Sequence, residues 1–280
     1  MAKSIAPPPK TPKIDRDVGG VEGLYLMTDA FSEEIEKSLF LNDAFFLPSV
    51  SNSGWHFTYE DQHRSGKRCH SVPSIPEPFL TADAYRLCNL VRDSGLYTEL
   101  VTPDYCLGLS YPGKDASGGG SEFRPHFDSR FRWGESVVGV TLGQGCLMNF
   151  IKRGEKVQIQ LPRRSIYVMT GQARTAWKHG ISKLSSKNLA SFPSYPDWNP
   201  LGMRRSLTLR CTKAVSDAFL EQELEKNPDD ERLQERLEEQ KKFRPQLSGK
   251  RLTNAELTSL KRQANNSLAV IAESKTDIRF

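Results

Sequence analysis

The feature that most constrains the fold is a series of short apolar runs, separated by turn residues, between Tyr105 and Thr212. The runs contain β-branched and aromatic residues, which favour strands, and the glycine and proline residues between them favour turns. The predicted strands span residues 105–111, 136–142, 146–151, 156–161, 165–169 and 204–212. Short strands at this spacing are typical of an antiparallel double sheet or barrel, so we expect a mainly β fold with flanking helices.

Two potential metal ligands, His126 and Asp128, lie two residues apart. In an extended segment such side chains project to the same face and can converge on one ion, and His179 could supply a third ligand from another strand. Two histidines and one carboxylate with open positions opposite are the ligand set of non-haem Fe(II) oxygenases. Calcium and magnesium favour more oxygen ligands, and structural zinc favours a closed tetrahedral shell. A His-x-Asp pair alone more often lies on an ordinary surface strand.

The last predicted strand carries polar and apolar side chains in alternation. Arg204, Ser206, Thr208 and Arg210 share one face, and the residues between them, with Leu207 and Leu209 among them, share the other. One interpretation places the leucines in the core and the arginines in water. The other directs the polar face into the mouth of a barrel, where guanidinium groups hold carboxylates through paired hydrogen bonds. Arg205 falls on the leucine face by the same alternation, so we expect it to point away from that mouth.

These segments together resemble the AlkB family of iron- and 2-oxoglutarate-dependent dioxygenases. The resemblance covers roughly residues 20–213, and its most specific parts are HFDSRFRWGE at 126–135, LPRRSIYVMTGQARTAWKHG at 161–180 and the arginine segment. Within the family the chain is similar to the eukaryotic branches, in particular the fourth and eighth animal homologues. The resemblance implies a double-stranded β-helix (jelly roll) core with N-terminal α/β lid elements.

The resemblance also implies a cofactor and its ligands. Fe(II) would be held by His126, Asp128 and His179, with 2-oxoglutarate as cosubstrate and dioxygen as oxidant. Arg204 would anchor the distal carboxylate of 2-oxoglutarate, and Arg210 would lie near its iron-chelating end and Asp128. The implied reaction converts 2-oxoglutarate to succinate and carbon dioxide while an N-methyl group is hydroxylated and released as formaldehyde.

Three further positions bear on the cosubstrate. Tyr111 matches the family tyrosine that donates a hydrogen bond to it. Leu109 and Ser206 stand where the family often has asparagine. Because serine can donate a hydrogen bond and leucine cannot, we expect Ser206 to remain a cosubstrate contact and Leu109 to have lost that role.

The segment from Trp55 to His70 is the candidate substrate entrance. Its aromatic residues alternate with polar ones, and its basic residues follow in the next loop; they are Trp55, Phe57, Tyr59, Arg64, Lys67 and Arg68. The family resemblance places a lid here whose aromatics stack on a base, and the cations could contact phosphates. Equally, the aromatics could pack in a core and the cations could lie on a solvated turn.

Composition shifts divide the chain into three parts. We expect a disordered basic tail at residues 1–20, the dioxygenase domain at 21–213 and a charged helical C-terminal extension at 214–280. Helices are predicted from about Glu33 and from Thr81 to Ser94, and the extension is interrupted at Asn227-Pro228. A capping box at residues 253–256 opens one more helix. The extension could pack against the barrel or bind a protein partner.

Charge and cysteine content suggest the compartment. The formal net charge of +5 is compatible with a polyanionic partner without requiring one. The 5 cysteines are scattered without a C-x-x-C pair, which is typical of free thiols in a reducing compartment. With no apolar run long enough to span a bilayer and no signal peptide, we expect an intracellular monomer in the cytoplasm, the nucleus or both.

Three functions are therefore carried forward. The first is an AlkB-like demethylase acting on methylated nucleic acid or methylated protein. The second is a hydroxylase of modified tRNA bases. The third is a non-catalytic jelly-roll module that has lost turnover and recruits a partner.

Overall fold

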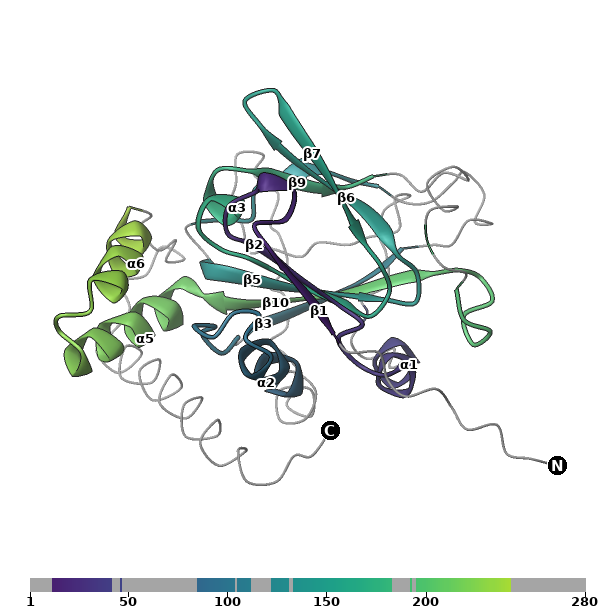
Figure 1. Cartoon of the computed structure of the whole chain (residues 1–280), viewed down its shortest axis with the longest axis horizontal. Coiled ribbons are helices and arrows are strands. Elements are labelled where there is room, and N and C mark those ends of the chain that lie inside the picture. Colours follow the sequence, from purple (N-terminus) through teal and green to yellow (C-terminus); the bar gives the residue numbers. More distant parts are fainter. Residues whose placement is uncertain are drawn as a thin grey trace, which may run out of the picture.

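The computed structural model describes residues 12–41, 46, 85–103, 105–111, 122–130, 133–182, 192 and 195–242. Two antiparallel sheets lie face to face, with helices against the outer face of the larger sheet and at one end of the sandwich (Figure 1). The prediction of a mainly β, double-stranded β-helix fold with flanking helices is confirmed.

The larger sheet has 6 strands in the order β1-β2-β8-β5-β10-β3. Neighbouring strands in this order pair antiparallel. The strands are β1 (Lys13–Arg16), β2 (Leu24–Thr28), β3 (Tyr105–Tyr111), β5 (Trp133–Leu142), β8 (Ser165–Met169) and β10 (Arg204–Thr212). The order brings strands that are far apart in the sequence side by side.

The smaller sheet has 4 strands in the order β4-β9-β6-β7. They are β4 (Phe123–His126), β6 (Cys146–Lys152), β7 (Glu155–Leu161) and β9 (Lys178–Ile181). A short helix, α3 (Gly171–Thr175), links β8 of the larger sheet to β9 of the smaller one. The β6–β7 hairpin extends beyond the sandwich (Figure 1).

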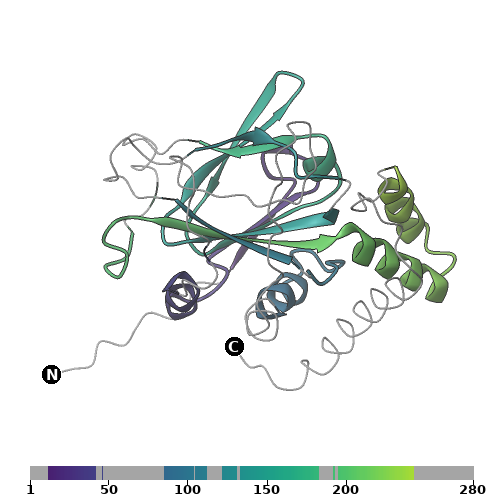
Figure 2. The same ribbon diagram turned by 180° about the vertical axis from the view of Figure 1, so that it is seen from behind.

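Strand β5 is buried at every position because both faces of the larger sheet are covered. Its inner face contributes Val137 to the cluster between the sheets, which includes Met148 and Phe150 of the smaller sheet. Its outer face contributes Val138 and Val140 to a second cluster. Two helices cover that cluster, α1 (Glu33–Leu41) and α2 (Tyr85–Asp93), and they lie beneath the larger sheet in Figure 2.

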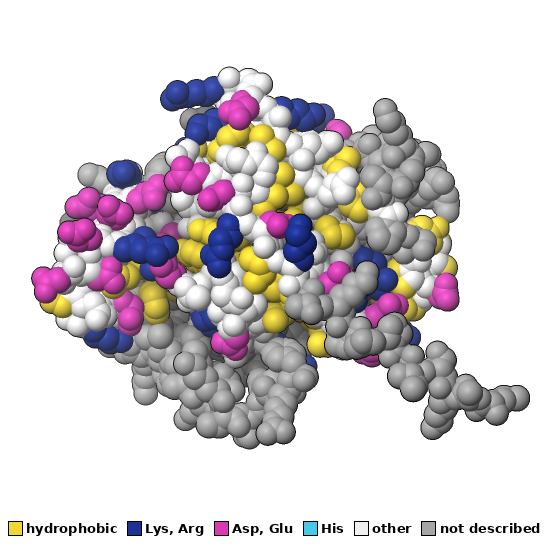
Figure 3. All heavy atoms as spheres, viewed as in Figure 1, with side chains coloured by type: hydrophobic (Ala, Val, Ile, Leu, Met, Phe, Trp, Pro, Cys, Tyr) yellow, Lys and Arg dark blue, Asp and Glu magenta, His cyan; other side chains and the backbone are white. Residues whose placement is uncertain are grey.

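The C-terminal helices are α5 (Lys213–Lys226), which continues directly from β10, and α6 (Glu231–Lys241). Helix α5 packs closely on β5, because a Cβ added to Gly134 would lie 2.5 Å from Ser216 Cβ. Arg236 of α6 donates hydrogen bonds to both carboxylate oxygens of Glu135. Acidic side chains gather over these helices (Figure 3). Within residues 213–242, the extension therefore packs on the end of the barrel.

Most predicted elements match the structure. The predicted strands correspond to β3, β5, β6, β7, β8 and β10, and β5 begins earlier than expected, at Trp133. Helix α1 begins at Glu33 as predicted, and the Ser32 hydroxyl accepts a hydrogen bond from the Ile35 amide at 3.4 Å. The interruption at Asn227-Pro228 separates α5 from α6.

The prediction of a disordered tail at residues 1–20 is wrong for the part that the structure describes. Residues 13–16 form edge strand β1, which pairs with β2, and residues 18–20 form a short 3-10 helix, η1 (Val18–Gly20). Backbone hydrogen bonds to a neighbouring strand need no apolar periodicity, so the sequence pattern gave no signal for an edge strand. The first predicted helical turn at Thr81 and the capping box at 253–256 lie outside the described residues.

Candidate functional site

The three predicted metal ligands converge between the two sheets. His126 ends β4 and lies directly opposite His179 of β9, and Asp128 follows two residues later. The His126 Nε2–Asp128 Oδ1 and His179 Nε2–Asp128 Oδ2 distances are both 3.9 Å. One ligand atom from each residue lies within 4.8 Å of the other two. The local two-residue spacing supplies two ligands, and cross-strand pairing supplies the third.

Hydrogen bonding orients His126 for metal binding. Its Nδ1 lies 2.9 Å from the backbone carbonyl oxygen of Arg124. A carbonyl can only accept, so Nδ1 carries the proton and the Nε2 lone pair faces Asp128 and His179. Such support by a carbonyl is the usual arrangement behind a metal-bound histidine.

The electrostatics of the triad favour the protonation states that bind a cation. Burial lowers the pKa of His179 to about 3, against the raising effect of Asp128, and burial also lowers the pKa of His126. Burial would raise the pKa of Asp128, but Arg210 and then His179 hold that pKa well below its usual range. At neutral pH the two imidazoles are therefore neutral and the carboxylate is ionised.

Two arginines support Asp128. Arg210 Nη2 donates to Asp128 Oδ1 at 2.8 Å. Arg174 of α3 donates to the backbone carbonyl of Asp128 at 2.9 Å and to that of Ser129 at 3.0 Å. The second oxygen, Asp128 Oδ2, is buried and accepts no hydrogen bond from any described residue. Asp128 Oδ2 lies 3.9 Å from His179 Nε2. A buried carboxylate oxygen beside an imidazole nitrogen fits a divalent metal ion, because burial without a partner is costly.

The polar face of β10 points into the same pocket, as predicted. Its residues line the pocket together with the three metal-ligand candidates; they are Arg204, Ser206, Thr208 and Arg210. Leu207 and Leu209 lie in the outer cluster instead. Arg205, also on that side, contacts the rings of Phe40 and Phe46 at 5.0 and 4.4 Å. The alternation along the strand therefore sorts the three arginines correctly.

Tyr111 and Arg204 are direct partners across β3 and β10. The Arg204 guanidinium lies 4.5 Å from the centre of the Tyr111 ring. Burial raises the pKa of Tyr111, against the lowering effect of Arg204, so its hydroxyl keeps its proton and can donate. Leu109 and Ser206 are partners two positions further along the two strands, and both line the pocket.

Arg204 is the unusual charge in the pocket. The residue is 2% exposed, and its Nε and Nη1 have no hydrogen-bond partner among the described residues. Among the described residues, the groups that most raise the pKa of Arg204, against the lowering effect of burial, are Cys146, Tyr111 and Tyr167, none of them a carboxylate. A buried guanidinium of this kind fits the carboxylate of a ligand, which could accept two parallel hydrogen bonds.

Two residues of the site were missed by the sequence interpretation. Tyr167 of β8 lines the pocket, and Arg174 holds the backbone beside Asp128. Both lie in the segment 161–180 that carries the family resemblance, which is the signal that could have found them. The predicted substrate-contacting residues lie outside the described residues; they are Trp55, Phe57, Tyr59, Arg64, Lys67 and Arg68.

Comparisons with known proteins agree with this geometry. The family model of the 2OG-Fe(II) oxygenase superfamily matches residues 40–210. Uncharacterized protein L905 of Acanthamoeba polyphaga mimivirus is 40% identical over 65 residues, which are 22% of this chain and 31% of that protein. The tRNA (carboxymethyluridine(34)-5-O)-methyltransferase ALKBH8 of Mus musculus is 40% identical over 58 residues, 20% of this chain and 9% of that protein. The chain thus covers less than a third of the length of these relatives.

Among solved structures, that of OsALKBH1 aligns with a TM-score of 0.43 and 16% identity over 68% of this chain and 96% of that one. The family match and the ALKBH8 segment confirm the predicted resemblance to AlkB-like oxygenases.

Proposed function

Because the chain belongs to the 2OG-Fe(II) oxygenase superfamily, whose members are dioxygenases using Fe(II), 2-oxoglutarate and dioxygen, we propose that it demethylates an N-methylated nucleic acid or protein. The observation that carries the proposal is the pairing, in one pocket, of a His-Asp-His triad with a buried guanidinium that lacks a described anionic partner. When bound, iron with 2-oxoglutarate and dioxygen supplies the oxidation of a substrate C–H bond, leaving succinate and carbon dioxide.

Each residue of the pocket has a definite task in this proposal. His126, Asp128 and His179 would hold the iron through three ligand atoms that lie within 4.8 Å of one another. Arg210 holds Asp128 Oδ1, so Oδ2 would remain free to bind the metal. Arg204 holds the distal carboxylate of 2-oxoglutarate, with Tyr111 and Ser206 beside it as further donors.

Apolar side chains make up the rest of the pocket wall. Val137, Met148, Met169 and Ile181 are buried and lie on facing strands of the two sheets. They exclude water from the reacting groups and strengthen the electrostatic contacts of the two arginines.

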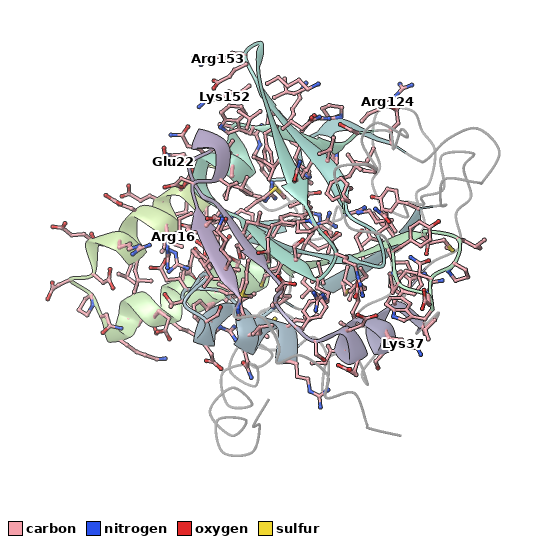
Figure 4. All side chains as sticks on the ribbon, turned by 45° about the vertical axis from the view of Figure 1, so that its right-hand side comes forward. Arg16, Glu22, Lys37, Arg124, Lys152 and Arg153 are labelled. Atoms are coloured by element: carbon pink, nitrogen blue, oxygen red, sulfur yellow. The ribbon has the colours of Figure 1, made fainter. Side chains whose placement is uncertain are left out.

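Charge distribution supports a nucleic-acid substrate. The net charge is +5, and exposed Arg124 and Arg153 lie on the smaller sheet, with Arg153 beside Lys152 at the end of the β6–β7 hairpin (Figure 4). Acidic side chains gather instead over helices α5 and α6, at one side of the sandwich (Figures 1 and 3). A polyanion would therefore approach from the side of the smaller sheet. A modified tRNA base is the second candidate, favoured by the local similarity to ALKBH8.

The first test measures turnover of 2-oxoglutarate in the absence of a methylated substrate. Purified protein with Fe(II), 2-oxoglutarate and dioxygen is expected to form succinate, and an Asp128→Ala variant is expected to form none. Absence of succinate from wild-type protein that has bound iron would instead favour a non-catalytic binding module.

A formaldehyde-release screen across methylated DNA, RNA, tRNA and lysine peptides then tests the substrate. The predicted entrance is tested by an Arg64/Lys67/Arg68→Ala variant. Loss of phosphate contacts is expected to weaken nucleic-acid turnover and its salt dependence while succinate formation without substrate stays unchanged. Unchanged nucleic-acid demethylation at physiological salt would exclude this loop as the phosphate-contacting element.

A further inference from the structure

Tyr167 is a buried polar side chain in the pocket to which neither the sequence nor the comparisons give a role. It lies in β8, opposite Gly139 of β5, and Gly139 in turn lies opposite Thr208 of β10. The three positions form one row across the larger sheet, on the face that lines the pocket. Tyr167 is 8% exposed.

Gly139 leaves the space that the Tyr167 ring occupies. A Cβ added to Gly139 would lie 2.0 Å from Tyr167 Cζ and 2.3 Å from its hydroxyl oxygen. The ring therefore does not stand above its own strand. It lies across the backbone of β5 and carries its hydroxyl toward β10.

The neighbouring rows of the sheet fix where that hydroxyl lies. On one side, Met169, Val137 and Arg210 form the row at the metal end of the pocket. On the other side, Thr141 and Ser206 form the row next to Arg204. The hydroxyl thus lies between Arg210, which is bonded to Asp128, and Ser206 with Arg204, which make up the carboxylate-binding end.

The chemical state of this hydroxyl suits a donor. Burial raises the pKa of Tyr167, against the lowering effect of Arg204, so the phenol stays protonated at neutral pH. A ligand held at one end by the triad and at the other by Arg204 would pass beside a protonated phenol that projects from the pocket wall.

We propose that Tyr167 is a cosubstrate-binding residue: its ring rests on Gly139, and its hydroxyl donates a hydrogen bond to 2-oxoglutarate between the two anchored ends. This inference rests on the proposed function, since it assumes that 2-oxoglutarate extends from the triad to Arg204. The residue pair Tyr167 and Gly139 then acts as one unit, with the glycine making room for the ring.

The test is binding of 2-oxoglutarate to Fe(II)-loaded protein without dioxygen, measured by calorimetry so that no turnover is involved. Tyr167→Phe keeps the ring and removes the donor, so the Kd for 2-oxoglutarate is expected to rise about three- to tenfold while Fe(II) affinity stays unchanged. Tyr25→Phe is the matched control, because Tyr25 pairs with Val168 on the outer face of the same sheet. It should leave both affinities unchanged.

Substitution of Gly139 provides a second readout. Gly139→Ala should weaken 2-oxoglutarate binding in the wild-type chain by displacing the ring, and should have little further effect in the Tyr167→Ala background.

The outcomes separate the two proposals. A wild-type Kd for 2-oxoglutarate in the Tyr167→Phe variant would overturn the role of Tyr167 and leave the proposed function intact. If wild-type protein loaded with Fe(II) bound no 2-oxoglutarate, both proposals would fail.

Discussion

Arg204, buried in the pocket, and Arg236, partly buried at the C-terminal helices, meet the cost of removing a charge from water in opposite ways. Arg236 bonds both oxygens of Glu135, donates to the Glu99 carbonyl at 3.2 Å and lies 3.4 Å from the Glu99 carboxylate. Arg204 has a tyrosine ring beneath it and no carboxylate among the described residues. A buried guanidinium needs an anion. Where the chain supplies one, the arginine is structural; where it supplies none, the arginine marks a ligand site.

The position of Glu135 explains why this pairing forms at the end of β5. The ladder between β5 and β10 shifts register between Arg210 and Thr212, which lie opposite Val137 and Trp133. Glu135 therefore falls in the irregular stretch, where a bulge can redirect a side chain out of the regular alternation. Its carboxylate reaches α6 instead of the pocket. Glu135 is the last residue of the resemblance segment 126–135, and its contact with α6 is structural.

The largest effect is expected from the carboxylate that completes the metal site. Asp128→Ala removes one of three ligands, and since loss of a supporting contact alone lowers metal affinity about 10–100-fold, the Kd for Fe(II) should rise at least about 100-fold. Titration with Fe(II) under nitrogen measures this, and circular dichroism checks the fold. Asp15→Ala, in the exposed pair with Lys13, is the control. Retained iron affinity in Asp128→Ala would remove the metal-site assignment.

Arg204→Met tests whether the pocket arginine binds a ligand or stabilises the fold. Losing a buried charged contact to 2-oxoglutarate costs about 2–5 kcal/mol, so the Kd for 2-oxoglutarate should rise by roughly 30-fold or more. Because no described carboxylate is left behind, the free energy of unfolding should stay constant or increase. Calorimetry and urea unfolding measure the two quantities. A marked loss of stability with unchanged 2-oxoglutarate binding would show that Arg204 is structural.

Arg236→Met is the reciprocal change. It leaves Glu135 buried without its cation, so the free energy of unfolding should fall by about 3 kcal/mol. The Kd for 2-oxoglutarate should change little, because Glu135 and Arg236 lie outside the residues that line the pocket. Urea unfolding of Arg204→Met and Arg236→Met under the same conditions compares their free energies of unfolding directly. Equal stability of both variants would break the comparison.

Arg205→Ala should give the smallest effect on the cosubstrate. Arg205 donates to the carbonyl of Phe40 and packs on aromatic rings of the outer cluster, so its loss should lower the free energy of unfolding by about 1 kcal/mol. Its effect on 2-oxoglutarate binding should be far below that of Arg204→Met. If Arg205→Ala proved the more damaging to cosubstrate binding, the assignment of faces along β10 would be wrong.

Local alternation explains how much of the fold and the site could be predicted. The positions of β3, β5, β6, β7, β8 and β10 follow from short apolar runs and turn residues, because the sequence itself shows the two-residue period of a strand. The same period placed Arg204, Ser206 and Arg210 on one face and Arg205 on the other, and it placed His126 and Asp128 together. Strands β4 and β9, of 4 residues each, are too short to show a period and were missed.

Tertiary structure determined which strands pair and which side chains meet. The register of β4 with β9 brings His179 opposite His126, and the register of β10 with β3 sets Arg204 on Tyr111. The Tyr167 ring crosses Gly139 because β8 pairs with β5, and Glu135 meets Arg236 because α6 folds back on the strand end. Residues far apart in the chain meet only through this pairing, and strand register depends on the packing of both faces at once, which no local pattern contains. The sequence by itself therefore determined the candidate ligands and their faces, and the folded chain determined that they form one pocket.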